Sequence, residues 1–480
     1  MLLPGPLLAL SFSVLTTLLT ATVNAQCPIY TRYANEKHEP LSPGRWQLAS
    51  MRPIPSCRTF KSQEVEDTIE RLRNIILDPD LMRLFENAWP STLDTTIAWT
   101  GLANRTVIQE PDLITNKTLY RLGRNQKLIS SEEAMKVKSQ EEKGEEELAF
   151  VVTGDIEAMW LRDSANQLLA YTSVLRSDGG NGKGTLASLF RGAINLQARY
   201  ILGDPFCNAF QAPEESRIKR KSSANSDTIS PSYDYFQVFS CQWELDSVAS
   251  FLQLSADYAE RTGDYAFFGR HSWIEAVEKI LEITESMMID SYDEDGNWQH
   301  TPYTYCAPYG GTPINSCNGS PHKGNIGLVR SFQRPSDDSC IYQYLIPSNM
   351  MYSVALNASS TIMSQVQPSG SNLTTWMRQM STGIRNGIED YAVVRDTKHG
   401  KIYAYEVDGY GSAIAMDDPN IPSLLSAPFL NYTGMKDSVY QNTRKKILSK
   451  DNPYYAWGPV ISGVGSMREF ASVPTFFFKL

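Results

Sequence analysis

Residues 248–287, VASFLQLSADYAERTGDYAFFGRHSWIEAVEKILEITESM, carry two apolar stripes, one after the other. The first stripe consists of Val248, Phe251, Leu252 and Ala259. The second consists of Trp273, Val277, Ile280, Thr284 and Met287. Side chains three or four residues apart share one face of an α-helix, so both stripes are typical of amphipathic helices. The stretch predicts two consecutive helices whose Trp and Met side chains belong to the core.

The same helical spacing recurs in the stretches 65–76, 81–88, 161–169 and 376–388. Strand signals are few, and the best is KIYAYEVDGYG (401–411), which alternates and ends in glycine like a short hairpin. Long loops separate the helices at 128–148, 211–230 and 302–340, and loops of this length are uncommon unless they are functional. These features predict an all-α fold, a toroid of helical hairpins with its chemistry at one end.

The composition excludes some partners. The 480-residue chain carries a net charge of −9, whereas binding to nucleic acid phosphates needs a basic surface. Its basic cluster RIKRKSS (217–223) lies among loop-forming residues and is interpreted as a solvated loop. The chain is long enough to bury one large core or two ordinary ones.

The first 25 residues are apolar and end in Val23-Asn24-Ala25, a plausible cleavage site. This pattern predicts a signal peptide and a protein that is secreted or enters the secretory pathway. After it, no stretch of 18 apolar residues remains that would predict a membrane span. Six Asn-X-Ser/Thr sites agree with export, at Asn104, Asn116, Asn318, Asn357, Asn372 and Asn431.

Seven cysteines allow disulfides in an oxidising compartment, and their odd number leaves at least one thiol without a partner in the chain. Their pairing cannot be read from the sequence. None has C-x-x-C spacing, so a structural zinc site is not expected. The sequence SDGGNGKGT (177–185) lacks the first glycine and the final Ser/Thr of a phosphate-binding loop. SYDEDGNW (291–298) lacks the acidic ligands that begin and end a calcium loop, and H-E-x-x-H and G-x-S-x-G motifs are missing. We expect neither a metal nor a cofactor.

Four clusters of acidic and aromatic residues remain. They are TGDIEAMWLRDSANQ (153–167), WELDS (243–247), FQRPSDDSCIYQYLIPSNM (332–350), and YAYEVDGYG (403–411) followed by MDDPNIPSLL (416–425). An aspartate near a helix start, such as Asp155 or Asp246, is by default an N-cap. Four such clusters together favour another interpretation, because most glycoside hydrolases cleave with a pair of carboxyl groups. The clusters predict a carbohydrate hydrolase.

At these motifs, and at NPYYAWGPVISGVGS (452–466), the sequence resembles glycoside hydrolase family 125, the exo-α-1,6-mannosidases, over about residues 60–465. The resemblance implies an (α/α)6 barrel and an inverting mechanism without metal or cofactor. The implied partner is a mannose-containing glycan with a terminal α-1,6-linked mannose. We expect the protein to be a monomer. A calcium-dependent α-1,2-mannosidase is disfavoured, because these motifs belong to a different family.

The resemblance also implies residue roles. The general acid is an aspartate of R-P-S-D-D, assigned to Asp337 with Asp338 as the alternative. Two adjacent carboxylates resist double ionisation, so one can keep its proton, and we expect Arg334 to hold the other in its charged form. The residues implied to bind the terminal mannose are Asp155, Trp160, Arg162, Asp163, Asp246, Arg334, Glu406 and Asp408.

The C-terminal end departs from the family. The family's general base is a glutamate in an H-E-S-F-like motif, whereas this chain continues from residue 466 as MREFASVPTFFFKL. The expected division is a signal peptide at 1–25, one truncated barrel domain at 26–466 and a non-family tail at 467–480. On this interpretation the general base is absent and the barrel is incomplete. The alternative function is then a mannose-binding remnant without catalysis.

Overall fold

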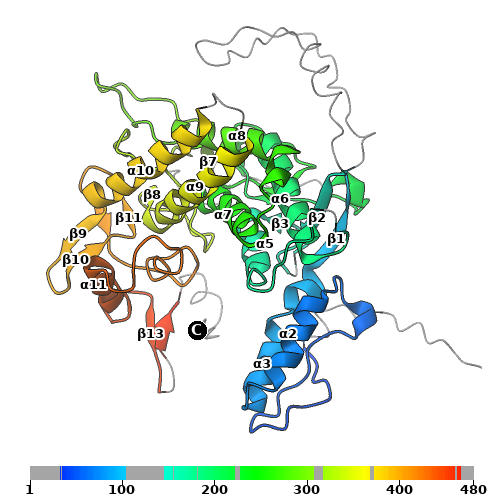
Figure 1. Cartoon of the computed structure of the whole chain (residues 1–480). Coiled ribbons are helices and arrows are strands. Elements are labelled where there is room, and N and C mark those ends of the chain that lie inside the picture. The colour runs from blue at the N-terminus through cyan, green and yellow to red at the C-terminus, as the bar shows by residue number, and fades with distance from the viewer. Residues whose placement is uncertain are drawn as a thin grey trace, which may run out of the picture.

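The computed structural model describes residues 27, 33, 35–103, 145–154, 156–180, 182–221, 227–306, 317–367, 372–459 and 462–465. Helices form most of its body (Figure 1). They are α2 (Gln63–Arg73), α3 (Pro79–Ala88), α5 (Leu161–Leu169), α6 (Leu186–Gly203), α7 (Leu245–Thr262), α8 (Trp273–Ser286), α9 (Ile346–Val366), α10 (Leu373–Tyr391) and α11 (Ser438–Ile447). Short helical turns are η1 (Pro55–Cys57), η2 (Thr92–Thr96), η3 (Glu214–Ser216) and η4 (Tyr265–Gly269).

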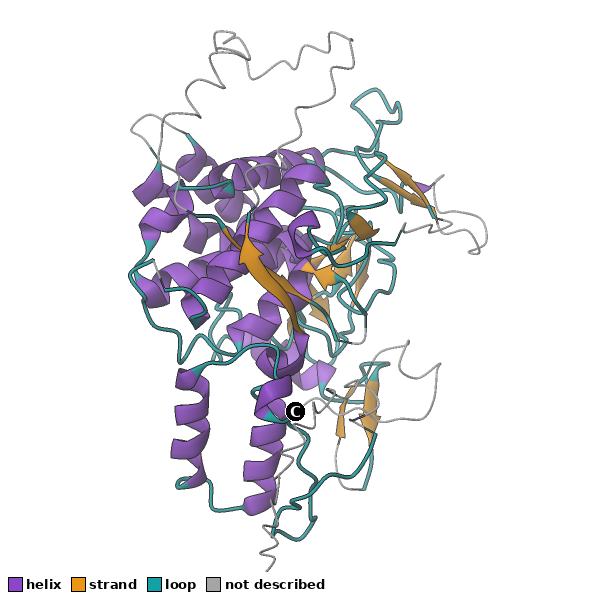
Figure 2. Ribbon diagram, turned by 90° about the vertical axis from the view of Figure 1, so that its right-hand side faces the viewer, coloured by secondary structure: helices purple, strands orange, loops and turns teal. Residues whose placement is uncertain are grey.

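Within the described residues, short strands form six small antiparallel sheets around the helices (Figure 2). Two sheets have three strands, β12 (Ala413–Ile414)–β11 (Glu406–Val407)–β8 (Tyr344–Leu345) and β3 (Met159–Trp160)–β4 (Ala209–Phe210)–β6 (Val238–Ser240). The two-stranded sheets are β1 (Ile97–Leu102)–β2 (Glu147–Val151), β5 (Thr228–Ser230)–β7 (Thr304–Cys306), β9 (Val393–Asp396)–β10 (Gly400–Tyr403) and β13 (Tyr455–Trp457)–β14 (Ser462–Val464). These sheets mean that the prediction of an all-α chain is not confirmed.

The helices of the main body form two layers. In one layer α7 packs against α5 and α9, and in the other α8 packs against α6 and α10. The chain alternates between the layers as it runs from α5 to α10, which is the arrangement of an α/α toroid (Figure 1). The pair α2 and α3 lies side by side below this body in both views.

The stretch that predicts two consecutive helices forms α7 and α8, as expected. Gly263 ends α7 in the left-handed conformation (φ 69°), and its N–H donates to the Ala259 carbonyl. Glycine adopts this conformation without the steric cost of a Cβ. The turn η4 then leads the chain back into α8.

The prediction that residues 401–411 form a hairpin is wrong, because the two strands in this stretch do not pair with each other. Residues 400–403 belong to β10, which pairs with β9, whereas β11 begins at Glu406 and lies between β8 and β12. The chain thus contributes to two different sheets within one alternating stretch. The second of these sheets carries Glu406, one of the residues predicted for the site.

Disulfides join Cys27 to Cys57, Cys207 to Cys241 and Cys306 to Cys317, and Cys340 is a buried free thiol. The unpaired thiol agrees with the odd count of cysteines. Within the described ranges, no helix is long and apolar enough to cross a membrane.

Several sequence predictions lie outside the described residues, namely the signal peptide, the tail at 467–480, Asp155, Asn104 and Asn116. Of the other predicted glycosylation sites, Asn357, Asn372 and Asn431 are exposed. Asn318 is only 8% exposed, and a buried amide is not accessible for glycan attachment in the folded protein.

Candidate active site

Residues 333–339 form a tight loop that presents the predicted acid, and we call it the acid loop. Gln333 and Ser339 pair across its base, and the Asp337 N–H donates to the Arg334 carbonyl at 2.9 Å. Asp337 has a φ of 63°, a left-handed conformation that aspartate tolerates better than most residues, and it is exposed. Asp338 is half-buried and accepts a hydrogen bond from Ser336 Oγ at 3.0 Å. The two adjacent carboxyl groups therefore have different surroundings.

Asp418 fastens the acid loop to the segment 416–425. Its Oδ2 accepts hydrogen bonds from Tyr405 Oη at 2.8 Å and from Ser336 Oγ at 3.2 Å. Its Oδ1 accepts from the Asn420 N–H at 3.0 Å. The carboxyl is 1% exposed, and this burial raises its pKa above the ordinary value.

Arg334 pairs with Glu406 rather than with its neighbours in the acid loop. Its Nε donates to Glu406 Oε1 at 2.5 Å, while Glu406 Oε2 accepts from the N–H groups of Ile341 and Tyr342 at 2.9 and 3.0 Å. The prediction that Arg334 holds Asp337 or Asp338 in its charged form is therefore wrong. Burial raises the pKa of Glu406, and the adjacent guanidinium opposes that shift. The pair anchors the acid loop to β11.

Arg162, near the start of α5, joins two carboxylates at the start of α7. Its Nη1 donates to Glu244 Oε2 and to Asp246 Oδ2, both at 2.8 Å. Its Nη2 lies 3.5 Å from Asp163 Oδ2. Asp246 Oδ1 also accepts from Ser348 Oγ at 3.3 Å. The N-cap interpretation of Asp246 is wrong, because the N-cap position of α7 is Glu244 and Asp246 lies within the first turn of the helix.

Glu244 is the unusual member of this network. Its Oε1 is buried and has no hydrogen-bond partner among the described residues, and the nearby Asn208 Nδ2 is likewise unpaired. Burial raises the pKa of Glu244 to about 7, Arg162 opposes that rise, and the charges of Asp246 and Asp337 add to it. One guanidinium cannot balance two buried carboxylates, so Glu244 keeps its proton up to neutral pH.

Replacing Glu244 by Gln is expected to make stability less dependent on pH. An ordinary glutamate has a pKa of 4.5, so the unfolded chain releases this proton at a lower pH than the folded protein, in which the pKa is about 7. Between these values the unfolded state binds fewer protons, and the free energy of unfolding falls as pH rises. For this shift the fall between about pH 5 and pH 7.5 is about 2 kcal/mol, and Gln removes it.

Chemical denaturation of the wild type and the Glu244→Gln variant at both pH values measures the difference. The contributions of groups that do not interact with Glu244 cancel in the comparison. Equal pH dependence in the two proteins would show that Glu244 ionises at its ordinary pKa.

One large cavity, of about 1130 Å³, brings these elements together. It is lined by Arg162 and Asp163 from α5, by Pro335 of the acid loop and by Asp418. We call it the site cavity. Asp246 acts on this wall indirectly, because it holds Arg162. Asp337, Asp338, Arg334 and Glu406 are not among the described residues that line the cavity, and the acid loop reaches it through Pro335.

Two predicted residues make other contacts. Asp408 accepts from the N–H groups of Tyr410 and Ser412 at 2.8 and 2.9 Å and so closes its own turn. The Trp160 ring packs edge-on against Phe239, with 5.4 Å between ring centroids. Neither is among the residues that line the site cavity.

The sequence interpretation missed further residues of the cavity wall, namely Asn166, Gln253 and Phe429, whereas Asp418 and Asn420 belong to the predicted cluster at 416–425. A signal existed for Asn166, which lies three residues after Asp163 on α5 and so shares its helix face. Gln253 and Phe429 carry no such signal, because their positions depend on how α7 and the segment 416–430 pack.

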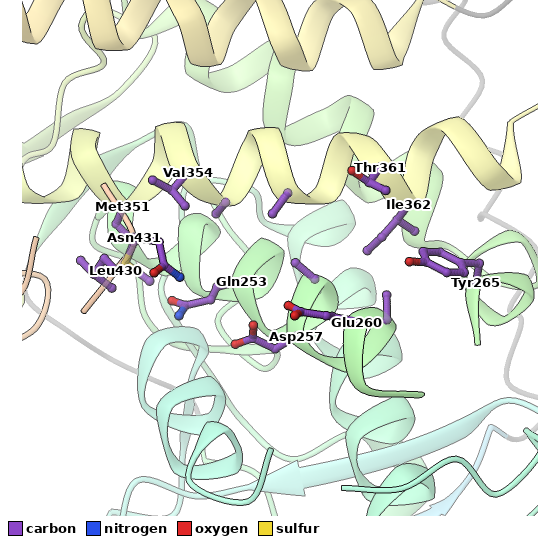
Figure 3. A pocket seen from close by; sticks show the side chains of 14 residues that line it. Gln253, Asp257, Glu260, Tyr265, Met351, Val354, Thr361, Ile362, Leu430 and Asn431 are labelled. Carbon is purple, nitrogen blue, oxygen red and sulfur yellow. The ribbon is translucent and has the colours of Figure 1, made fainter. Parts of the chain in front are cut away.

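A second cavity, of about 270 Å³, lies between α7 and α9. Figure 3 shows Gln253, Asp257 and Glu260 on one side of it and Val354, Thr361 and Ile362 on the other. Gln253 and Leu430 line both this cavity and the site cavity. Burial, with a smaller contribution from Glu260, raises the pKa of Asp257 to about 6.

A two-layered α/α fold with an acid loop beside a cavity lined by carboxyl groups is an arrangement that suits a glycoside hydrolase. Comparison with known proteins identifies the glycoside hydrolase family. The family model described as metal-independent alpha-mannosidase (GH125) matches residues 78–472. The chain belongs to glycoside hydrolase family 125.

Two relatives illustrate the similarity. The chain is 41% identical over 445 residues to the meiotically up-regulated gene 157 protein of Schizosaccharomyces pombe, covering 92% of this chain and 78% of that protein. Among solved structures, it resembles a metal-independent α-mannosidase of Streptococcus pneumoniae in a non-productive complex with α-1,6-mannobiose. That match has a TM-score of 0.65 and 28% sequence identity, and it covers 87% of this chain and 83% of the other.

Proposed function

We propose that the protein is an exo-acting, inverting α-1,6-mannosidase of the secretory pathway that removes terminal mannose from mannan or N-glycans. The observation that carries this proposal is the placement of the acid loop beside the site cavity in a member of family 125. The streptococcal relative was solved with α-1,6-mannobiose, which supports the choice of linkage.

In the proposed reaction Asp337 donates its proton to the oxygen that links the terminal mannose to the rest of the glycan. Arg162 and Asp163 offer a guanidinium and a carboxylate to the sugar hydroxyls from the cavity wall. Inversion further requires that a second carboxyl group take a proton from a water molecule on the opposite face of the ring. The first released mannose then has the β configuration.

The alternative is a chain that binds mannose without turnover. One observation favours it, namely that both carboxylates on the described cavity wall are already engaged. Asp163 lies 3.5 Å from the Arg162 guanidinium, and both oxygens of Asp418 accept hydrogen bonds. Neither is poised to activate water.

Digestion of mannobioses followed by NMR tests the proposal. We expect α-1,6-mannobiose to be cleaved in preference to the α-1,2 and α-1,3 isomers, with β-mannose as the first product. α-Mannose as the first product, or a preference for α-1,2 linkages, would contradict it. Binding of mannobiose without release of mannose would favour the alternative.

A further inference from the structure

The site cavity is larger than the removal of one sugar requires. Its volume of about 1130 Å³ exceeds the range of about 300–1,000 Å³ that is usual for small-molecule sites. An exo-acting enzyme holds only the terminal sugar at the reacting bond. Space beyond that of one sugar is therefore available to the rest of the glycan, on the leaving-group side of the cleaved bond.

The wall of the site cavity carries three side-chain amides. Asn166 comes from α5, Gln253 from α7, and Asn420 from the segment after β12. None of the three amides forms a side-chain hydrogen bond within the ranges that the structure describes. Each amide offers two N–H donors and an acceptor oxygen, which suits the alternating donors and acceptors of sugar hydroxyls.

Phe429 adds an aromatic face to the same wall. Its side chain is 73% exposed, although it lines a cavity. An exposed phenylalanine costs free energy in water unless something covers it. The C–H face of a pyranose is a flat apolar surface, so it can cover an aromatic ring while its hydroxyls reach neighbouring amides.

We propose that the site cavity binds an α-1,6-linked mannooligosaccharide longer than a disaccharide, and that it holds the sugars on the leaving-group side of the cleaved bond. Phe429 is the aromatic surface on which one of these sugars stacks. Asn166, Gln253 and Asn420 form hydrogen bonds with the sugar hydroxyls. This inference rests on the proposed mannosidase function. It assigns to Phe429 the preference of the enzyme for longer oligosaccharides. The charged groups on this wall are the guanidinium of Arg162 and the carboxyl groups of Asp163 and Asp418, so no unopposed positive charge is offered to an anion, which agrees with a neutral ligand.

The test compares binding of α-1,6-mannobiose and α-1,6-mannotetraose by calorimetry, in an Asp337→Asn background that prevents turnover. We expect the tetraose to bind more tightly than the disaccharide. Phe429→Ala is expected to weaken tetraose binding by about 10-fold and disaccharide binding by much less. Phe429→Leu should lose a similar factor, because it keeps an apolar side chain but no flat face, whereas Phe429→Trp should retain binding.

Phe236→Ala is the matched control, since Phe236 is 60% exposed and is not among the cavity-lining residues. It should leave both affinities unchanged. The proposal would be overturned if the two sugars bound with equal affinity or if neither bound. It would also be overturned if Phe429→Leu bound the tetraose as tightly as the protein with native Phe429. Hydrolysis by the chain with native Asp337 is measured separately. Tighter binding of the longer sugar without hydrolysis would therefore reject the proposed function but keep this inference. Hydrolysis with equal binding of both sugars would keep the proposed function and reject this inference.

Discussion

Replacing Asp337 by Asn should lower turnover of α-1,6-mannobiose by about 10²–10⁴-fold and leave binding of the sugar largely intact. A mannose leaving group is poor, so the glycosidic oxygen needs a proton as its bond breaks. Asn has nearly the same shape as Asp but no acidic proton. Asp337 stands at the exposed tip of the acid loop, so the substitution leaves the fold undisturbed.

Asp338→Asn is the matched control, because it changes the adjacent residue in the same way. Asp338 is half-buried and accepts from Ser336, and Asn can still accept that hydrogen bond. Its effect on turnover should be small. An aryl mannoside with a good leaving group needs little help from an acid, so it should restore most of the rate lost in Asp337→Asn.

If Asp338→Asn instead abolished turnover, the acid would be Asp338. Full activity in both variants would remove the acid loop from the mechanism.

The helices were predictable where one face is apolar and the other polar. The stripes in residues 248–287 gave α7 and α8 correctly, because periodicity is a local property of the sequence. By contrast, α6 and α9 were not predicted. Both are buried on most sides, so their apolar residues do not form a single stripe.

The site was predictable as a set of motifs but not as a set of contacts. Arg162 and Asp246 were both selected, and they meet although they lie far apart in the sequence. The partner of Arg334 was not predicted, since two aspartates nearby in the sequence are a more obvious choice than Glu406. The short turn of the acid loop directs the guanidinium away from them. Loop geometry of this kind is set by packing rather than by local residue pattern.

The burial of the ion pair between Arg334 and Glu406 leads to a prediction about stability. Arg334→Ala should lower the free energy of unfolding by about 3–5 kcal/mol, a large fraction of the 5–15 kcal/mol that is typical of a domain. The two side chains are 4% and 0% exposed. Without the guanidinium, Glu406 would keep its two backbone N–H donors but lose its counter-charge. A buried carboxylate without a counter-charge costs several kcal/mol or must take up a proton.

Denaturation midpoints in urea at neutral pH measure the loss. Lys279→Ala breaks an exposed pair with Glu282, whose side chains are 38% and 45% exposed, and should change stability by no more than about 0.5 kcal/mol. Adding Glu406→Gln to Arg334→Ala removes the uncompensated charge, so the double variant should recover part of the loss. This recovery separates charge burial from lost packing, because truncation of the arginine side chain is the same in both variants. A double variant no more stable than Arg334→Ala would assign the loss to packing, and a single variant as stable as wild type would show that the pair does not hold the acid loop.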